Sequence, residues 1–331
     1  MKYANFSIAR RRFLALLGTG MLWGLLPGCR GKSASPLAVA AHIWPGYEFM
    51  FLAQREGWLA ASQVTLRETP SASDSMKALA DGAVDAAALT LDEVLRARAA
   101  GTALSVVLVF DISAGADVVL ARPPIRELKQ IKGKRIGVEQ SALGALMLAK
   151  ALQAAGLQRD EVRVVPLTFD QHEAAWQRGE VDVLVTFSPV SSRLLDTGAV
   201  NLYDSRQLPD TIVDVLAVRQ EALERKRDAL RHLVAAHLRG RGHLQRNPQD
   251  ASYRMAAHLG LHPGEVLASY KGIVLPDLAG NRRLLGGPNP VLLASARMLS
   301  NIMHKEGLLQ QPNRLDGLLY ADSLPEAENE D

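Results

Sequence analysis

Between residues 37 and 219, short apolar runs alternate with longer stretches of helical periodicity. The apolar runs have the length of buried strands, and several are rich in valine, which favours strands. Strands that alternate with helices of this size predict parallel sheets with helices on both faces. After residue 219 almost every periodic stretch is helical. The pattern therefore predicts an α/β fold completed by C-terminal helices.

Capping residues predict where two of the helices begin. Ser71 precedes a helix expected to run to Ala80, where an Asp-Gly pair stops it. Thr90 and Glu93 have the spacing of a capping box, which predicts a helix to Ala100.

Two of the apolar runs resemble each other. Residues 117–122 and 214–219 both open on Asp, continue with valine, leucine and alanine, and close on Arg. We interpret them as neighbouring strands through which the chain enters and leaves a second lobe. This predicts two doubly wound lobes joined by a two-strand hinge, with a ligand cleft between them. Chance similarity of two valine-rich strands is the alternative.

This interpretation sets the domain boundaries. We expect a leader over 1–29, a tether over 30–36, a first lobe from 37–112 plus 220–321, a second lobe over 113–219, and a disordered acidic tail over 322–331.

The first 29 residues have the layout of an export signal. Three arginines at 10–12 precede an apolar segment over 13–26, which is short for a membrane span. The sequence 26–29 then resembles a bacterial lipobox, which implies lipidation of Cys29. The arginines also resemble a twin-arginine signal, so export by Sec or Tat stays open. We expect a periplasmic protein anchored by lipid, with the membrane that holds the anchor left open.

Composition excludes several classes of protein. The chain has 331 residues and a formal net charge of +3, and no Lys/Arg run in its body suggests nucleic-acid binding. Cys29 is the only cysteine, so the chain has no internal disulfide and no cysteine-built metal or iron–sulfur site.

The order of these elements resembles the periplasmic solute-binding proteins of ABC importers, above all the nitrate/sulfonate/taurine-binding group, which includes binders of the thiamine pyrimidine. The likeness covers residues 37–219. It implies two lobes, a ligand in the cleft and delivery to a permease and its ATPase, and it leaves the solute open. The residues that carry it are 44–48, the Gly82/Asp85 and Gly179/Asp182 turns, 128–138 and 186–189.

In open α/β sheets the ligand lies beyond the carboxyl ends of the strands. Serine and threonine hydroxyls there coincide with expected helix N-termini, which suit a small anion; plain capping is the alternative. Acidic residues are common in the same loops, whereas Lys and Arg are scarce. We expect most of these acids to complement helix N-termini, while Asp111 and Asp214 are the candidates to face an amine or amidine; inter-lobe hydrogen bonding is the alternative. Aromatic residues on the Pro-Gly loop can cover a ligand or pack between lobes. The candidate ligand-binding residues are Trp44, Tyr47, Glu48, Ser73, Thr90, Asp111, Ser141, His172, Ser188 and Asp214.

His42 is a further candidate contact, and Phe187 fits the core better than the site. We expect no metal, no cofactor and no enzymatic activity, because neither a nucleophile elbow nor a phosphate loop is present. The expected protein is a monomeric transport receptor for a small polar solute, such as a sulfonate with an amine or an amino-bearing ring. A sensory lipoprotein that signals to a membrane kinase or cyclase is the alternative.

Overall fold

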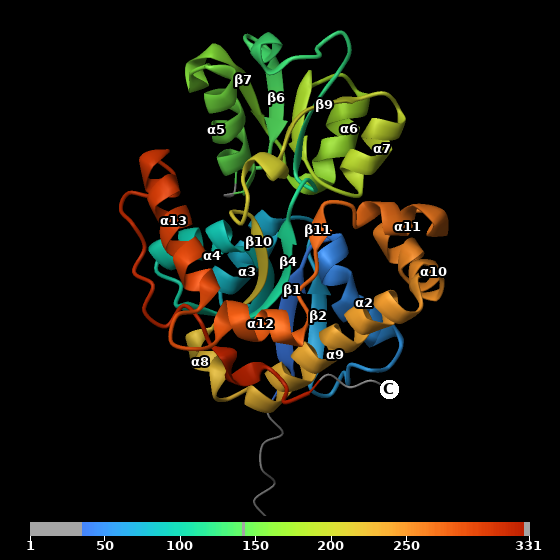
Figure 1. Cartoon of the computed structure of the whole chain (residues 1–331), viewed down its shortest axis with the longest axis vertical. Helices are drawn as coiled ribbons and strands as arrows, with labels where there is room; N and C mark the ends of the chain where they lie inside the picture. Colours follow the sequence, from blue (N-terminus) through green and yellow to red (C-terminus); the bar gives the residue numbers. More distant parts are fainter. Residues whose placement is uncertain (1–34, 141–142, 328–331) are drawn as a thin grey trace, which may run out of the picture. The chain divides into compact units, whose positions relative to one another are not determined.

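The computed structural model describes residues 35–140 and 143–327, so the leader, Cys29 and Ser141 lie outside the described residues. Its strands form two sheets (Figure 1). The six-stranded sheet has the order β11-β4-β10-β3-β1-β2, and the five-stranded sheet has the order β7-β6-β8-β5-β9. The strands are β1 (Leu37–Ala41), β2 (Val64–Glu68), β3 (Ala86–Thr90), β4 (Leu104–Ser113), β5 (Val118–Ala121), β6 (Arg135–Val138), β7 (Arg163–Pro166), β8 (Val183–Thr186), β9 (Val200–Asp204), β10 (Val213–Arg219) and β11 (Ile273–Val274).

Helices cover both faces of each sheet. In the first lobe, α2 and α9 pack on one face and α3, α4 and α13 on the other, because successive strand residues point to opposite sides. In the second lobe, α5 lies on one face and α6 with α7 on the other (Figure 1). The helices are α2 (Glu48–Arg55), α3 (Ala72–Ala80), α4 (Leu91–Ala99), α5 (Leu143–Ala155), α6 (His172–Gln177), α7 (Val190–Asp196), α8 (Gln220–Leu223), α9 (Arg227–Arg246), α10 (Pro248–Leu259), α11 (Pro263–Ser269), α12 (Leu278–Leu285) and α13 (Val291–Lys305).

The sheets are mixed, which corrects the expectation of purely parallel sheets. β10 runs antiparallel to β3 and β4, and β5 runs antiparallel to β8 and β9. The reason is topological: the chain leaves the first sheet at β4 and re-enters it at β10 from the opposite direction. The six-stranded sheet is therefore built from two separate parts of the chain, as predicted.

The two matched runs are not neighbouring strands, so that interpretation is wrong. β5 belongs to the second sheet and β10 to the first. The chain crosses between the two sheets instead in the segments that follow β4 and β9. There Ser113 Oγ and Ser205 Oγ are 2.7 Å apart, and the Ser205 N–H donates to the Asp117 carbonyl at 3.0 Å. Because β4 is ten residues long, it reaches the boundary itself, and β5 begins only beyond it.

The C-terminal segment differs from the expected disordered tail. The one-turn 3-10 helix Ala321–Ser323 contains Ser323, which is fully buried, so the predicted disordered tail begins in ordered structure. Residues 328–331 lie outside the described residues.

Within residues 35–140 and 143–327, no helix combines the length and the apolar character that crossing a membrane requires.

Candidate functional site

A cavity of ≈ 30 Å³ lies where the two lobes meet. A cavity of this size holds about two water molecules. It receives side chains from the carboxyl ends of β1, β3, β6 and β8, as expected for an α/β crevice. Its lining is formed by His42, Trp44, Tyr47, Ala72, Thr90, Glu93, Asp117, Glu139, Leu143, Gly144, Met147, His172, Val185, Thr186, Phe187 and Asp214.

The turn after β1 anchors two aromatic side chains to buried acids. Trp44 Nε1 donates to Asp111 Oδ2 at 2.9 Å, and the Tyr47 hydroxyl donates to Asp214 Oδ1. Gly46 makes this approach possible, since a Cβ there would lie 1.8 Å from Asp111 Oδ2. The indole of Trp44 also meets Phe187 of the second lobe edge-on, with ring centroids 5.3 Å apart. The aromatic turn thus contacts both the acids and the opposite lobe.

The acids beside the cavity are buried, and burial raises their pKa values because it disfavours the charged form. The pKa of Asp117 rises to about 7, that of Asp111 to about 7 and that of Glu93 to about 8. The pKa of Asp214 is raised well above its usual range by burial and by the nearby Asp111. Among the described residues that line the cavity, none is Lys or Arg. The site is therefore a buried acidic pocket without a basic counterpart in its wall.

Two histidines in the wall are buried as neutral rings. Burial lowers the pKa of His42 and of His172 to about 4. His172 Nδ1 lies 3.1 Å from Thr186 Oγ1, while the His42 ring meets the Tyr47 ring edge-on. These imidazoles supply neutral hydrogen-bonding edges to the cavity and no positive charge.

Glu139 joins the lobes at one side of the cavity. Its Oε1 accepts from the backbone N–H of Ser73 at 2.9 Å and from the Ser73 hydroxyl at 2.6 Å. Ser73 lies in the first turn of α3, so a carboxylate from the second lobe satisfies a helix N-terminus of the first. Glu139 and Ser73 also line a groove of ≈ 600 Å³ outside the cavity. Glu139 therefore stands between the groove and the cavity.

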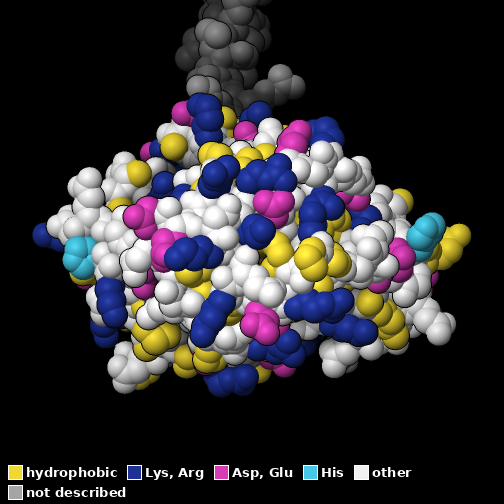
Figure 2. Space-filling model, turned by 90° about the horizontal axis from the view of Figure 1, so that it is seen from above, with side chains coloured by type: hydrophobic (Ala, Val, Ile, Leu, Met, Phe, Trp, Pro, Cys, Tyr) yellow, Lys and Arg dark blue, Asp and Glu magenta, His cyan; other side chains and the backbone are white. Residues whose placement is uncertain are grey.

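Other polar contacts link the lobes around this point. Arg96 of α4 donates to the Gln140 carbonyl at 2.8 Å. Lys150 of α5 forms an ion pair with Glu306, after α13, at 2.9 Å. Figure 2 shows Lys and Arg side chains scattered with acidic ones over one outer face, whereas the cavity is lined by acids without Lys or Arg among the described residues.

The structure brings together half of the sequence-predicted site. Trp44, Tyr47, Thr90, His172 and Asp214 line the cavity. Asp111 lies directly behind Trp44, and Ser73 lies in the outer groove. Ser188 is outside the lining, with its hydroxyl 3.0 Å from that of Ser192. Ser141 lies outside the described residues.

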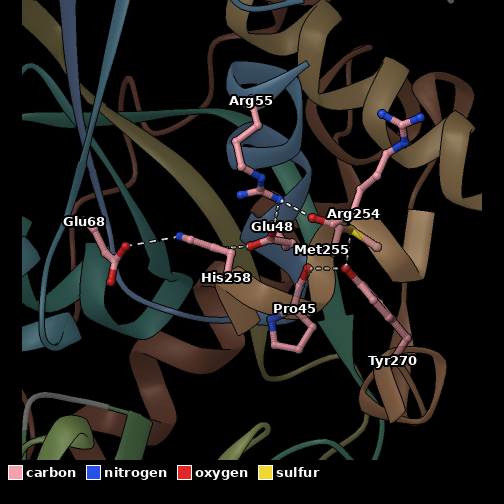
Figure 3. A network of polar contacts seen from close by, with 8 residues as sticks. All are labelled: Pro45, Glu48, Arg55, Glu68, Arg254, Met255, His258 and Tyr270. Atoms are coloured by element: carbon pink, nitrogen blue, oxygen red, sulfur yellow. Dashed lines mark hydrogen bonds and ion pairs between the residues drawn. The ribbon is translucent and has the colours of Figure 1, made fainter. Parts of the chain in front are cut away.

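Glu48 is placed elsewhere, and its assignment to the site is corrected. Its buried carboxylate forms an ion pair with Arg55 and accepts from His258, which reaches Glu68 at 3.1 Å with its other nitrogen (Figure 3). Burial opposes protonation of His258, but the two glutamates outweigh it and raise its pKa. As the first residue of α2, Glu48 points to α10, because a helix turns successive side chains away from the strand end.

Several residues that line the cavity were not among the predicted site residues. Asp117 opens the first of the two matched runs, as Asp214 opens the second. That position was the available signal, but we interpreted Asp117 only as a strand boundary. Phe187 lines the cavity although we expected it in the core. Met147 and Thr186 could not be recognised from the sequence. Met147 lies on the apolar face of α5 and Thr186 ends β8, and residues in such positions have the same sequence pattern whether or not they line a site. Across residues 35–140 and 143–327, no cluster of His, Cys, Asp and Glu has an arrangement that fits a metal ion.

Comparison with known proteins places this architecture among binding proteins. The model of the family described as "NMT1/THI5 like" matches residues 44–251, more than half of the chain. An Escherichia coli (strain K12) protein assigned as an aliphatic sulfonates-binding protein is 29% identical over 72% of this chain and 79% of its own length. The taurine-binding periplasmic protein of the same organism is 24% identical over 72% of this chain and 78% of its own length.

Solved structures support the fold. The alkanesulfonate-binding protein SsuA from Xanthomonas axonopodis pv. citri, bound to MOPS, superposes with a TM-score of 0.73 at 19% identity. The alignment covers 87% of this chain and 98% of that one. The desulfurization enzyme DSZB shares the fold with a TM-score of 0.60 at 19% identity, over 87% of this chain and 97% of its own. The predicted fold, two lobes of the periplasmic binding protein type, is confirmed.

Proposed function

Because the chain belongs to the NMT1/THI5-like family, we propose that it is an extracytoplasmic receptor that captures a small polar solute between its lobes and delivers it to an ABC permease. The observation that carries this proposal is the cavity itself, which is lined by side chains of both lobes. A site divided in this way forms only when the lobes approach, so binding and hinge closure are coupled. A permease then has a closed form to recognise.

The relatives give a first set of solutes to test. Their names refer to aliphatic sulfonates and taurine. Nitrate and the thiamine pyrimidine complete the set that the sequence suggested. A sensory receptor would need the same hinge, and no feature of the cavity favours that role.

We propose binding rather than catalysis, although one fold neighbour is an enzyme. The pairing of His172 with Thr186 has the residue types of a base and a nucleophile. Burial lowers the pKa of His172 to about 4, however, which makes it a weak general base. The aromatic and acidic lining instead matches a pocket that orients a ligand by shape and hydrogen bonds.

A thermal-shift screen tests the receptor function. The panel contains nitrate, aliphatic sulfonates, taurine, small amines and aminopyrimidines, together with a small-molecule extract of the source cells. A solute that binds only the folded protein raises its Tm in proportion to the logarithm of its concentration. We expect at least one member to do so. If neither the panel nor the extract shifts the Tm, the receptor function is contradicted.

A further inference from the structure

The inference concerns the charge of the ligand, and it rests on the proposed receptor function. Four carboxyl groups line the cavity, two from each lobe or its connections: Glu93, Asp117, Glu139 and Asp214. Asp111 lies just behind them, bonded to the Trp44 indole. No lysine or arginine lines the cavity within the described part of the chain. An anion placed here would therefore meet no positively charged side chain and would repel the ionised form of these carboxyl groups, so burying it would be unfavourable.

One of the helix N-termini near the cavity, that of α3, is already occupied. Helix α3 is nine residues long, and the Ser73 N–H in its first turn would be a natural donor to a sulfonate. That N–H and the Ser73 hydroxyl both donate to Glu139 Oε1. The chain thus supplies its own carboxylate at the position where a bound anion would otherwise lie.

Polar atoms in the wall are left without protein partners. Asp117 is 3% exposed and lines the cavity, and its Oδ2 has no hydrogen-bond partner. His42 is 5% exposed, and its Nδ1 likewise has none. Buried polar atoms of this kind are normally satisfied, and a carboxylate oxygen is satisfied by a donor. The ligand that completes this wall therefore carries N–H or O–H groups directed at Asp117.

Aromatic rings form the other walls. Trp44, Tyr47 and Phe187 line the cavity, and His42 packs against both Tyr47 and Phe187. Ring faces attract cations, most strongly where water is excluded.

We propose that the cavity binds a small organic cation, with its charge on N–H groups such as an amidinium or ammonium, and that it excludes sulfonates. The N–H groups donate to Asp117 and to the neighbouring acids, and the aromatic rings enclose the apolar part. A bound cation favours the ionised form of these carboxyl groups, so binding releases protons from them. The sulfonate specificity of the relatives then does not extend to this chain.

Isothermal titration calorimetry with two matched probes tests the proposal. Acetamidinium and methanesulfonate both carry one methyl group and are of similar size, but they have opposite charges. We expect acetamidinium to bind with a Kd at least about tenfold lower than that of methanesulfonate. Asp117→Asn keeps the shape and removes the charge, so it should weaken acetamidinium binding by about tenfold or more. Asp250→Asn, at an exposed acid, is the matched control and should leave the Kd unchanged.

Three results would overturn the proposal. Tighter binding of methanesulfonate, or no binding of acetamidinium at millimolar concentration, contradicts it, and so does an unchanged acetamidinium Kd in a folded Asp117→Asn. Asp214→Asn serves as the second variant if Asp117→Asn does not fold. A sulfonate that binds in calorimetry and raises the Tm in the screen would leave the receptor function intact while refuting the charge assignment. An absence of any hit in the screen would contradict the receptor function itself.

Discussion

At the scale of single residues, the protein keeps acids buried without basic partners. Asp111 and Asp214 are each bonded by an aromatic donor, and Asp117 has one carboxylate oxygen with no partner. Such groups stay protonated well above the pH at which an exposed acid ionises. Protonation keeps these buried groups neutral when no cation is bound. A bound cation favours their ionised form.

This burial makes stability depend on pH. For an acid whose folded pKa is raised, the unfolded chain releases its proton first, so the free energy of unfolding falls as pH rises through the interval between the two values. For Asp117 that interval runs from 3.8 to about 7. The buried His42 and His172 act oppositely, but only between about 4 and 6.5. Above pH 6.5 the acids dominate, and His258, whose pKa is raised, acts in the same direction.

We therefore predict that the free energy of unfolding decreases from pH 6.5 to pH 8. Asp117→Asn removes one of the responsible groups and should reduce the decrease by roughly 1 kcal/mol. Urea denaturation of both proteins at several pH values measures the difference. Asp250→Asn is the control, because that acid is exposed and its pKa is lowered by Arg254 and His243. A wild-type stability that is constant or rises over this interval would show that the acids are not buried as described.

The sequence predicted which loops border the cavity, but it did not predict which side chains in those loops point into it. The sequence predicted Trp44, Tyr47, Thr90 and His172 in loops at strand ends and Asp214 at the start of a strand, and all five line the cavity. Which of two adjacent residues in such a loop points inward depends on tertiary packing. Tyr47 lines the cavity. Its neighbour Glu48 points instead to His258 of α10 (Figure 3). Their roles in ligand binding stay predictions.

At the scale of elements, the contact between β6 and α3 is the clearest link between the lobes. Glu139 follows β6 and satisfies two donors of Ser73 near the start of α3. Hydrogen bonds to a charged acceptor contribute about 1.5–3 kcal/mol, more than neutral ones. The bond exists only when the lobes are together, so its energy favours the closed arrangement.

Glu139→Ala should therefore expose the beginning of α3. We predict that amide hydrogen exchange of a peptide covering residues 72–80 becomes about tenfold faster or more, because the lobes separate more often. Glu139→Gln keeps an acceptor oxygen and should give a smaller effect. Glu180→Ala removes an exposed ion pair with Arg178 and should have no effect on this peptide. Equal exchange in the wild type and Glu139→Ala would argue against this link.

Elements specified by local signals were predictable from the sequence. The cap at Ser71 is confirmed, since its side chain accepts from Asp74 N. The capping pair of Thr90 and Glu93 is confirmed by the bond from Thr90 N to Glu93 Oε2 at 2.9 Å. β9, β11 and α12 were not predicted. β11 has only two residues and is specified by its pairing with β4, which no local pattern records.

At the scale of the whole molecule, the alternation of strands and helices sufficed to predict two lobes, and the hinge could not be located in the same way. Two similar strands suggested adjacency, but strand pairing depends on where the chain crosses between sheets. The crossings are short segments, residues 114–117 and 205–212, which are too short to show a periodic pattern. The boundaries proposed for the two lobes stay predictions beyond the sheet membership that the structure gives.

Export and anchoring also belong to this scale. We propose that Cys29 is lipidated and tethers the receptor to a membrane from the periplasmic side. Cys29→Ser should then release the protein into the soluble fraction or leave it uncleaved. Metabolic labelling with an alkyne fatty acid, followed by fractionation and mass spectrometry of the N-terminus, measures this. Membrane retention of a cleaved, unlipidated Cys29→Ser chain would contradict the anchor.

The distance between the lobes tests the receptor account most directly. Nitroxide labels at cysteines introduced for Arg67 in β2 and Lys129 after β5, both exposed, report on one lobe each in a Cys29→Ser background. Double electron–electron resonance is recorded with and without the solute that raises the Tm most. We predict a broad distribution of distances without solute and a single narrower distribution with it, because the solute binds both lobes at once. A solute that binds and leaves the distribution unchanged would contradict capture between the lobes.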